Sequence, residues 1–361
     1  MTAALRLGVV GAGAITRLRH LPAICLHPDK VRITAVTDML PGAALSLAEQ
    51  IGGASVFNDL DSLLKSGEID AAIVATPHFL HFEQAHRLME AGVPALVEKP
   101  LVTRLDDLRR LRSASERTGT LLVSGQMQRF DPVNVLARRW IESDPSRFGD
   151  LVSFSMRSWQ DITEYTAHAG SGHWLLDGAR AGGGVVVSLA VHQLDLLRYL
   201  SGVDYAEVTA VGRFAKPFYG GAESSAVVLL TMSNGAVGTL NSTYAAPRGF
   251  QSESLSLFGE HGGFSRAFQD QGSYHGPLLY SSAHDWDIVD FSSESARQEL
   301  GLVSDLGSDP FENQILHFVS AVRGEAPPIN TVVENFNTVA CLAAINEALL
   351  APGSAISIPT T

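Results

Sequence analysis

The sequence of 361 residues is poor in cysteine and in positive charge. Its two cysteines, Cys25 and Cys341, lie far apart in sequence, so no disulfide framework is expected and a reducing compartment such as the cytoplasm fits. We expect both to be small core residues. Lysine and arginine together number 26 against 38 aspartates and glutamates, which gives a formal net charge of −12. This balance argues against nucleic acid as a partner, because binding its backbone requires lysine and arginine gathered on one face.

The chain also lacks an apolar run long enough to cross a bilayer, so no membrane partner is expected. Its apolar opening, MTAALRLGVVGAGAI, has a weak charged region and runs directly into a glycine-rich turn, which favours a first β-strand over a signal peptide. No internal repeat or low-complexity tract is present. With 45% hydrophobic residues and a length beyond the usual size of one core, the chain is expected to form two domains.

A partial dinucleotide-binding fingerprint follows the first expected strand, residues 5 to 10. Gly11 and Gly13 open a turn into a helix, but Thr16 stands where a third glycine would be. Amides at the start of that helix suit a pyrophosphate. Asp38, 25 positions after Gly13 and at the end of the next strand-like run, is placed to bind the adenosine ribose. A carboxylate there would repel a ribose phosphate, so NAD is expected in preference to NADP; the alternative is that Asp38 is only a turn residue.

Strand-like and helix-like runs then alternate as far as Ser124, with strands expected in IDAAIVATP, PALVEKPL and TGTLLVSGQ. This alternation predicts a doubly wound half with a parallel sheet. The helix after Pro100 is expected to begin at Thr103, with Asp106 three residues on as a capping pattern, and to stop at Gly119.

The stretch GGGVVVSLAVHQLDLLRYLSG, residues 182 to 202, is apolar almost all round as a helix except at four positions. Steps of four, three and four residues place these on one face, and they are Ser188, His192, Asp195 and Tyr199. Burying such groups without partners costs about 1 to 3 kcal/mol each, so they must face partners, water or a ligand. We expect this polar stripe to face a cleft between the domains.

Five motifs together resemble those of the Gfo/Idh/MocA oxidoreductases. In chain order they are GAGAITRLRH, ATPHFLH, AGVPALVEKPL, GQMQRFDP and AGGGVVVSLAVHQLDLLRYLSG. The resemblance implies an α/β protein with an N-terminal Rossmann domain, residues 1 to 124, that binds NAD. It also implies a C-terminal α/β domain, residues 125 to 361, which has a large, mostly antiparallel sheet, binds substrate and holds the chain in a homodimer or homotetramer. The sequence agrees, because the βα rhythm is lost after Gly125 and a hairpin signal occurs at Asn234-Gly235.

The resemblance assigns the chemistry to Lys99 and His192. In such enzymes a secondary alcohol of a sugar, sugar derivative or cyclitol gives a hydride to nicotinamide and its hydroxyl proton to a base. Histidine suits that base, and a lysine beside the alcohol oxygen stabilises the developing negative charge. Outside such motifs, a lysine before a proline is usually a solvated charge and a histidine on a buried helix is usually a satisfied core group.

On the cofactor side, two residues have open alternatives. His81 shares a helical face with Ala85 and Leu88, so a structural role is the alternative to cofactor binding. For Arg129 the equal alternative is an ion pair that links the two domains. His78 and His81 have no cysteine or acid at supporting spacing, so no metal is expected. The residues expected to bind the cofactor are Gly11, Gly13, Ala14, Ile15, Asp38, Thr76, Pro77, His81, Glu98, Lys99 and Arg129.

The segment that precedes the polar-striped helix, RSWQDITEYTAHAGSGHWLLDGARAGGG, is rich in sugar-binding chemistry. Trp159 and Trp174 are expected to stack on a sugar or cyclitol face, with packing of Trp174 under the glycine turn as the alternative. The other residues expected to bind substrate are Gln160, Asp161, Tyr165, His173, Lys99, Ser188, His192 and Asp195.

Ser188 departs from the resemblance, because the family usually has Asp one helical turn before the histidine. A carboxylate there would stabilise an imidazolium, whereas serine offers only a neutral hydroxyl. Asp195, three residues after His192, is expected to supply the missing charge and is counted as catalytic. The other outcomes are a less basic histidine or a loss of catalysis.

The interpretation we favour is therefore an NAD-dependent dehydrogenase or reductase. Two alternatives from other classes stay open. One is a sugar-sensing regulator of the same fold that binds cofactor without turnover, and the other is a glycosidase that uses NAD for a transient oxidation.

Overall fold

In the computed structural model, residues 3–163, 172–247, 249–269, 278–282, 298 and 306–360 are described, and the chain divides into two compact units. Unit 1 comprises residues 1–130 and 307–336, and unit 2 comprises residues 131–306 and 337–361. The first break therefore lies close to the expected boundary at Ser124. The segment 307–336, which the expected division leaves in the C-terminal domain, packs with unit 1.

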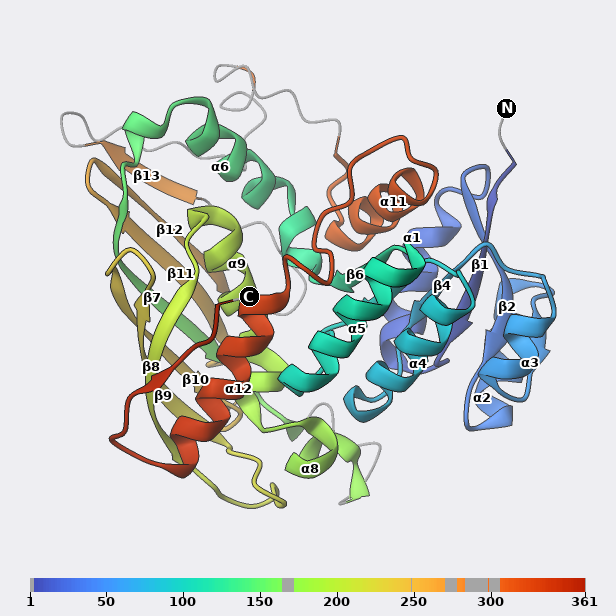
Figure 1. Cartoon of the computed structure of the whole chain (residues 1–361), viewed down its shortest axis with the longest axis horizontal. Coiled ribbons are helices and arrows are strands. Elements are labelled where there is room, and N and C mark those ends of the chain that lie inside the picture. The colour runs from blue at the N-terminus through green and yellow to red at the C-terminus, as the bar shows by residue number, and fades with distance from the viewer. Residues whose placement is uncertain are drawn as a thin grey trace. The chain divides into compact units, whose positions relative to one another are not determined.

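Unit 1 contains a parallel sheet whose six strands lie in the order β3-β2-β1-β4-β5-β6 (Figure 1). The strands are β1 (Leu5–Val10), β2 (Val31–Thr37), β3 (Ser55–Phe57), β4 (Ala71–Val74), β5 (Ala95–Glu98) and β6 (Leu122–Gly125). The order reverses between β1 and β4, and open α/β sheets bind ligands beyond the carboxyl ends of the strands at such a point. The expected doubly wound half is confirmed.

The helices of unit 1 include one that begins differently from the sequence prediction. They are η1 (Thr16–His20), α1 (Leu21–Cys25), α2 (Pro41–Ile51), α3 (Leu60–Lys65), α4 (His78–Glu90), α5 (Leu105–Thr118), η2 (Met127–Phe130) and α11 (Pro310–Val322). Helix α5 ends at Gly119, which has a φ of 67°, as expected. Its N-cap is Arg104 and no side chain caps it, so the capping pattern predicted from Thr103 is wrong.

The two cysteines are free, and they differ in burial. Cys341 is buried as expected, but Cys25 is exposed, which corrects the expectation that both are core residues. The physical reason is that Cys25 is the last residue of α1, and the residues of that helix that face the core are Leu21, Ala23 and Ile24.

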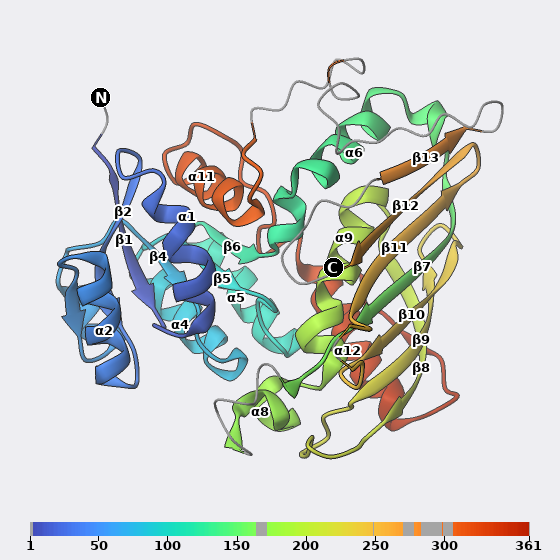
Figure 2. The ribbon, with the colours of Figure 1, turned by 180° about the vertical axis from the view of Figure 1, so that it is seen from behind.

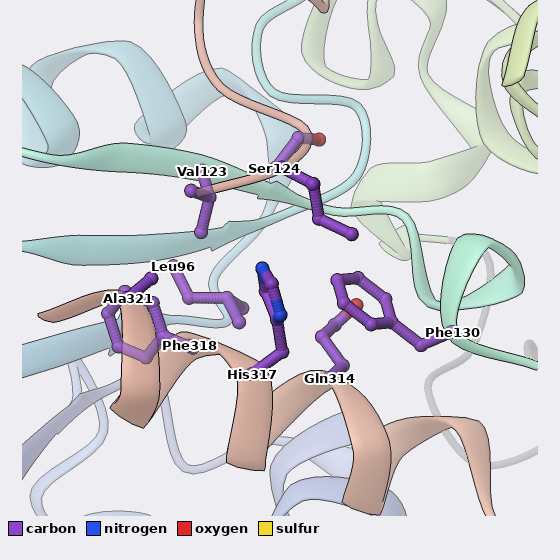
Figure 3. Close-up of a pocket in the computed structure, with 9 residues that line it drawn as sticks. Leu96, Val123, Ser124, Phe130, Gln314, His317, Phe318 and Ala321 are labelled. Atoms are coloured by element: carbon purple, nitrogen blue, oxygen red, sulfur yellow. The ribbon is translucent and has the colours of Figure 1, made fainter. Parts of the chain in front are cut away.

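Helix α11 is distant in sequence from the strands that it covers, β5 and β6. Side chains from these elements line one cavity of about 10 Å³, and Figure 3 shows the His317 ring extending from α11 toward Val123 and Ser124. The ring of Phe130 lies 5.3 Å from that of His317 between centroids. Beyond the helix, Asn330 Nδ2 donates to the Ser124 carbonyl at 2.7 Å and its own carbonyl accepts from the Ser124 amide at 2.9 Å. These contacts explain why residues 307–336 belong to unit 1.

Unit 2 is built on an eight-stranded sheet in the order β13-β12-β11-β7-β10-β9-β8-β14. The strands are β7 (Leu151–Trp159), β8 (Tyr205–Arg213), β9 (Ser225–Met232), β10 (Val237–Thr243), β11 (Ser252–Gly259), β12 (Gly262–Gln269), β13 (Leu278–Ser282) and β14 (Ile356–Ser357). All neighbours are antiparallel except β7 and β10, which confirms the expected mostly antiparallel sheet. The predicted hairpin joins β9 to β10, with Gly235 at a φ of 88° and the Asn234 side chain accepting from the Ala236 amide at 3.0 Å.

One face of this sheet is covered by helices of unit 2, among which α9 and α12 lie on the same side (Figures 1 and 2). The helical segments are α6 (Pro132–Ser143), η3 (Pro145–Arg147), η5 (Trp174–Leu176), α8 (Gly178–Ala181), η6 (Val186–Ala190), α9 (Val191–Ser201) and α12 (Phe336–Leu350). Along β9 the residues alternate, with Val228 and Leu230 buried and Val227 and Leu229 exposed. No helix in the described ranges has the length and hydropathy needed to cross a membrane.

Candidate active site

The turn between β1 and η1 combines a glycine that packing requires with one that is open to solvent. Gly11 has a φ of 105°, and a Cβ there would lie 2.5 Å from the Ala75 carbonyl oxygen at the end of β4. Gly13 is exposed, and a Cβ there would meet no atom within 4 Å. The N-cap of η1 is Ile15, whose apolar side chain makes no capping hydrogen bond. The start of this helix thus offers backbone donors and open space to an anion, which fits a pyrophosphate.

Thr16 explains how the turn forms without a third glycine. Its hydroxyl donates to the Gly11 carbonyl at 2.6 Å, and the residue is wholly buried. The side chain therefore closes the turn from the protein side and leaves the side of Gly13 open. Thr16 is also the first residue of η1, a wide helical turn in which the Leu21 amide donates to the Thr16 carbonyl, five residues back.

Asp38 lies at the end of β2 against the same turn. Its Oδ2 accepts from the Ala12 amide at 2.7 Å and its Oδ1 accepts from the Leu40 amide at 2.8 Å. A carboxylate has about four acceptor positions, so these contacts leave capacity for a ligand. The sequence did not single out Arg17, whose guanidinium donates to the carbonyls of Ala12 and Ala43 and so ties the turn to α2.

Lys99 directly follows β5 and lies beside a buried carboxylate. Glu98 Oε2 accepts from the Lys99 amide at 3.1 Å, and Glu98 Oε1 lies 2.8 Å from His20 Nε2. His20 is 0% exposed and Glu98 is 7% exposed. Burial by itself would raise the pKa of Glu98, but the contact with His20 and the positive charge of Lys99 outweigh it and lower that pKa. The sequence did not single out His20, because 78 residues separate it from Glu98.

His81 fixes the loops after β4 and β5 to one another. Its Nδ1 lies 2.8 Å from the Pro100 carbonyl and its Nε2 lies 2.8 Å from the Thr76 carbonyl. Burial lowers the pKa of His81 against both of these contacts, so the neutral ring donates to one of the two carbonyls. Two other residues predicted to bind the cofactor lie next to this loop contact. The Thr76 hydroxyl donates to the Gln84 side chain at 2.6 Å, and Pro77 is the N-cap of α4.

Arg129 is the last of the residues that the sequence predicts to bind the cofactor. It lies in η2, directly after β6, and is 6% exposed. Within unit 1 the predicted cofactor residues therefore follow the carboxyl ends of β1, β2, β4, β5 and β6, which lie at the same edge of one parallel sheet.

In unit 2, Ser188 and His192 lie at the junction of η6 and α9. The sequence predicts one helix over residues 182 to 202, whereas the structure has a wide turn, η6, that leads into an ordinary helix ending at Ser201. The Ser188 hydroxyl donates to the Gly184 carbonyl at 2.9 Å. Ser188 is 5% exposed and His192 is 8% exposed. A wide turn has more residues per turn than an α-helix, so it rotates Ser188 relative to His192.

Asp195 is connected to helix α12. The Thr338 hydroxyl donates to Asp195 Oδ1 at 3.3 Å and accepts from Arg198 Nη1 at 2.9 Å. Arg198 in turn pairs with Asp204 at 2.5 Å. Thr338 therefore links the Asp195 carboxylate to a partly exposed ion pair.

A buried carboxylate that the sequence did not reveal holds the start of η6. Glu223 is 0% exposed; its Oε2 accepts from the Gly184 amide at 2.7 Å and its Oε1 accepts from the Val186 amide at 2.9 Å. Burial raises the pKa of Glu223 against these two hydrogen bonds. A Cβ at Gly184 would collide with the Glu223 backbone, so a glycine is required there.

The expected substrate-binding residues at the end of β7 make contacts of their own. Trp159 Nε1 donates to Asn241 Oδ1 at 2.8 Å, and Arg157 lies 4.8 Å from the centre of the indole ring. Since strand neighbours alternate, Trp159 faces away from the side of buried Ser158. The Gln160 amide donates to Thr243, and the Asp161 side chain accepts from the amide and hydroxyl of Thr163.

His173 and Trp174 come together at η5. Their ring centres are 5.6 Å apart, and His173 Nδ1 accepts from the Leu175 amide at 3.3 Å. Burial lowers the pKa of His173. Tyr165 lies outside the described residues. Across the part of the chain that is described, no group of three His, Cys, Asp or Glu side chains is arranged to hold a metal ion.

Two family models match most of the chain. Residues 5–126 match a model described as "Oxidoreductase family, NAD-binding Rossmann fold", and residues 135–265 match the "GFO/IDH/MocA C-terminal domain".

Individual relatives and solved structures are similar over different lengths. The scyllo-inositol 2-dehydrogenase (NAD(+)) of Bacillus subtilis (strain 168) is 24% identical over 351 residues, which cover 95% of this chain and 93% of that protein. A 1-carboxy-3-chloro-3,4-dihydroxycyclohexa-1,5-diene dehydrogenase of Comamonas testosteroni is 31% identical over 197 residues, or 55% of this chain and 47% of that protein, so the match spans about half of that relative. The WlbA dehydrogenase from Bordetella pertussis, solved in complex with NADH and UDP-GlcNAcA, superposes with a TM-score of 0.83 at 25% identity over 99% of both chains.

Proposed function

Because this chain belongs to the GFO/IDH/MocA oxidoreductase family and has an NAD-binding Rossmann domain, we propose that it transfers hydride between NAD and a secondary alcohol of a sugar, sugar derivative or cyclitol. The observation that carries the proposal is the open glycine turn of unit 1 together with Lys99 at the end of the same sheet. The names of two relatives, a scyllo-inositol dehydrogenase and a dehydrogenase solved with NADH and UDP-GlcNAcA, support this substrate class.

The cofactor residues divide by the part of NAD that each would hold. The amides around Gly13, including Ala14 and Ile15, would bind the pyrophosphate, and the Asp38 carboxylate would accept from the ribose hydroxyls. The loops that carry Thr76, Pro77, His81, Glu98, Lys99 and Arg129 would line the nicotinamide half. When bound, NAD accepts the hydride at its nicotinamide ring.

Lys99 and His192 would act on the alcohol group itself. The Lys99 ammonium donates to the alcohol oxygen and stabilises the negative charge that develops there, and His192 takes the hydroxyl proton. This division requires the two units to present both side chains to one alcohol. Asp195 would hold His192 in its working state in place of the family aspartate that Ser188 replaces. Substrate contacts by Trp159, Gln160, Asp161, Tyr165, His173 and Trp174 remain predictions.

We expect Lys99→Ala and His192→Ala each to abolish turnover while leaving NAD affinity largely intact, because both residues act on the alcohol rather than on the adenosine half. Purified protein would be incubated with NAD and a panel of sugars and cyclitols, with NADH followed by absorbance and NAD affinity measured by calorimetry. Near-wild-type rates in either variant would remove that residue from the mechanism. Release of an aglycone in place of NADH would favour the glycosidase alternative, and binding without turnover by the wild type would favour the regulator.

For cofactor choice, kcat/KM with NAD should exceed that with NADP by at least about tenfold, or about 1.4 kcal/mol. Asp38→Asn should reduce that ratio, because it removes the negative charge but keeps an oxygen that can accept from the Ala12 amide. Asp38→Ala, which also removes that acceptor, separates the effect of charge from that of turn geometry. Equal efficiency with both cofactors in the wild type would contradict the role proposed for Asp38.

Asp195→Asn should lower turnover by at least about tenfold, as expected when a general base loses the charge that holds it in its working state. Thr338→Val is the matched control, because it removes the hydroxyl that bonds Asp195 but leaves the carboxylate charged. We expect a smaller loss from Thr338→Val and from Ser188→Ala. Equal losses from Asp195→Asn and Thr338→Val would instead assign Asp195 to packing between α9 and α12.

We also propose that the chain forms a homodimer or homotetramer through the face of its large sheet opposite α9 and α12, where apolar side chains such as Val211, Val227, Leu229 and Phe258 are exposed among the described residues. Leu229→Arg should lower the mass in solution, measured by light scattering, to that of one chain. The matched control is Leu45→Arg on α2, because Leu45 and Leu229 are both 53% exposed. A wild-type mass of one chain, or equal dissociation by both substitutions, would refute this interface.

A further inference from the structure

Helices α4 and α5 lie side by side in unit 1 (Figures 1 and 2). Side chains of both helices line an open groove of about 320 Å³. One of these residues comes from α4 and the others from α5, and they are His86, Arg109, Arg110, Ser113, Ala114 and Arg117. Within α5, spacings of three and four residues place the side chains on one face of the helix. None of the six is among the residues assigned above to the cofactor or the substrate.

This groove gathers positive charge in a chain that has little of it. The sequence has 26 lysines and arginines among 361 residues and a formal net charge of −12, yet three arginines meet here. An arginine guanidinium carries five N–H donors and no acceptor, and the Ser113 hydroxyl is a further donor. No carboxylate is among the described side chains that line the groove. The groove therefore suits an anion with several acceptor oxygens.

The ion pairs of the two arginines near the start of α5 are weak. Arg109 Nη1 lies 2.9 Å from Asp106 Oδ1, and Arg110 Nη1 lies 3.9 Å from Asp107 Oδ1. The side chains of both arginines are more than half exposed. Exposed pairs of this kind contribute about 0 to 1 kcal/mol, because the two charges interact in a medium of high dielectric constant. An anion with more than one negative charge can therefore compete with these carboxylates for the guanidinium groups.

Contacts between the two helices position the basic side chains in advance. The Arg110 Cζ atom lies 4.4 Å from the centre of the Phe82 ring of α4, so the guanidinium stacks on the ring and keeps its N–H edge for other partners. The Phe82 ring in turn lies 5.8 Å from the His86 ring. Near the end of α5, Arg117 pairs with Glu90, the last residue of α4. Less side-chain freedom is lost on binding when donors are already held in this way.

We propose that this groove is a binding site for a small phosphate compound with two or more negative charges, and that Arg109, Arg110 and Arg117 are its main donors. Guanidinium groups bind phosphate oxygens through paired N–H bonds. A long polyanion such as a nucleic acid is less suited, because the chain has a net charge of −12 and a carboxylate pairs with each of the three arginines. The site does not depend on the proposed reaction.

The test uses inorganic pyrophosphate as the probe, with binding to the full chain measured by calorimetry at physiological ionic strength. The glycine turn of unit 1 is itself expected to bind a pyrophosphate, so the protein is first saturated with NAD. We expect saturable binding that Arg110→Ala and Arg117→Ala each weaken by about tenfold or more, because each removes a charged donor. Inorganic phosphate, which carries less charge, should bind more weakly than pyrophosphate.

Arg112→Ala is the matched control. Arg112 lies on the same helix and pairs with Glu116 at 3.0 Å, but it does not line the groove, so its removal should leave pyrophosphate affinity at the wild-type value. Equal weakening by Arg112→Ala and Arg110→Ala would overturn the proposal, because it would indicate general attraction to a basic helix. The absence of pyrophosphate binding to the NAD-saturated wild type would overturn it as well.

The experiment also separates this inference from the proposed function. If the wild type does not bind NAD, the same three variants are compared without it, and a loss of pyrophosphate affinity in Arg110→Ala and Arg117→Ala alone still supports the groove. If NAD binds and is reduced normally but the variants bind pyrophosphate as the wild type does, then the proposed function stands and the anion site fails.

Discussion

Backbone amides at the start of a helix need acceptors, and the two helices that carry the candidate chemistry satisfy this requirement in opposite ways. In unit 2, the amides of Gly184 and Val186 donate to the buried carboxylate of Glu223, so the start of η6 is closed from within. In unit 1, the N-cap of η1, Ile15, makes no side-chain capping hydrogen bond, and Gly13 is exposed with open space where its Cβ would be. The same backbone requirement therefore gives a fixed support for His192 in one unit and an anion-binding position in the other.

The closed start of η6 also accounts for the serine that departs from the family pattern. The Ser188 hydroxyl donates to the carbonyl of Gly184, whose amide is held by Glu223. An aspartate at this position is an acceptor when ionised, so it would be repelled by the same carbonyl and would have to point elsewhere. Serine is therefore compatible with the wide turn. Compared with the family aspartate, it places no charge beside His192 but makes a hydrogen bond within the helix.

Features that depend on neighbouring residues could be predicted from the sequence. The glycine turn at Gly11, the helix stop at Gly119 and the hairpin at Asn234-Gly235 all follow from backbone conformations that few residues other than glycine adopt readily. The start of α5 could not be placed, because its N-cap, Arg104, makes no side-chain hydrogen bond and the Thr103 pattern is not used.

Features that depend on distant residues left no comparable local signal. Neither the packing of α11 on β5 and β6 nor the contact between His20 and Glu98 follows from periodicity or spacing. The candidate site shows the same limit. Lys99 and His192 could be predicted from their motifs. Glu223, whose carboxylate holds the start of η6, lies 39 residues after Gly184, so no local pattern connects it to that helix.

Three buried carboxylates are stabilised in three different ways. Asp131 is paired with the guanidinium of Arg266 at 2.8 Å, both side chains are 1% exposed, and the charge of this pair is balanced inside unit 2. Glu223 bonds two amides at a helix start, where the helix dipole favours a negative charge, and no side-chain cation is needed. Glu98 Oε1 lies 2.8 Å from His20 Nε2 and its Oε2 accepts from the Lys99 amide at 3.1 Å, and these two neighbours lower the pKa of Glu98 against the effect of burial. The Glu98 carboxylate therefore ties the loop that carries Lys99 to η1, which carries His20.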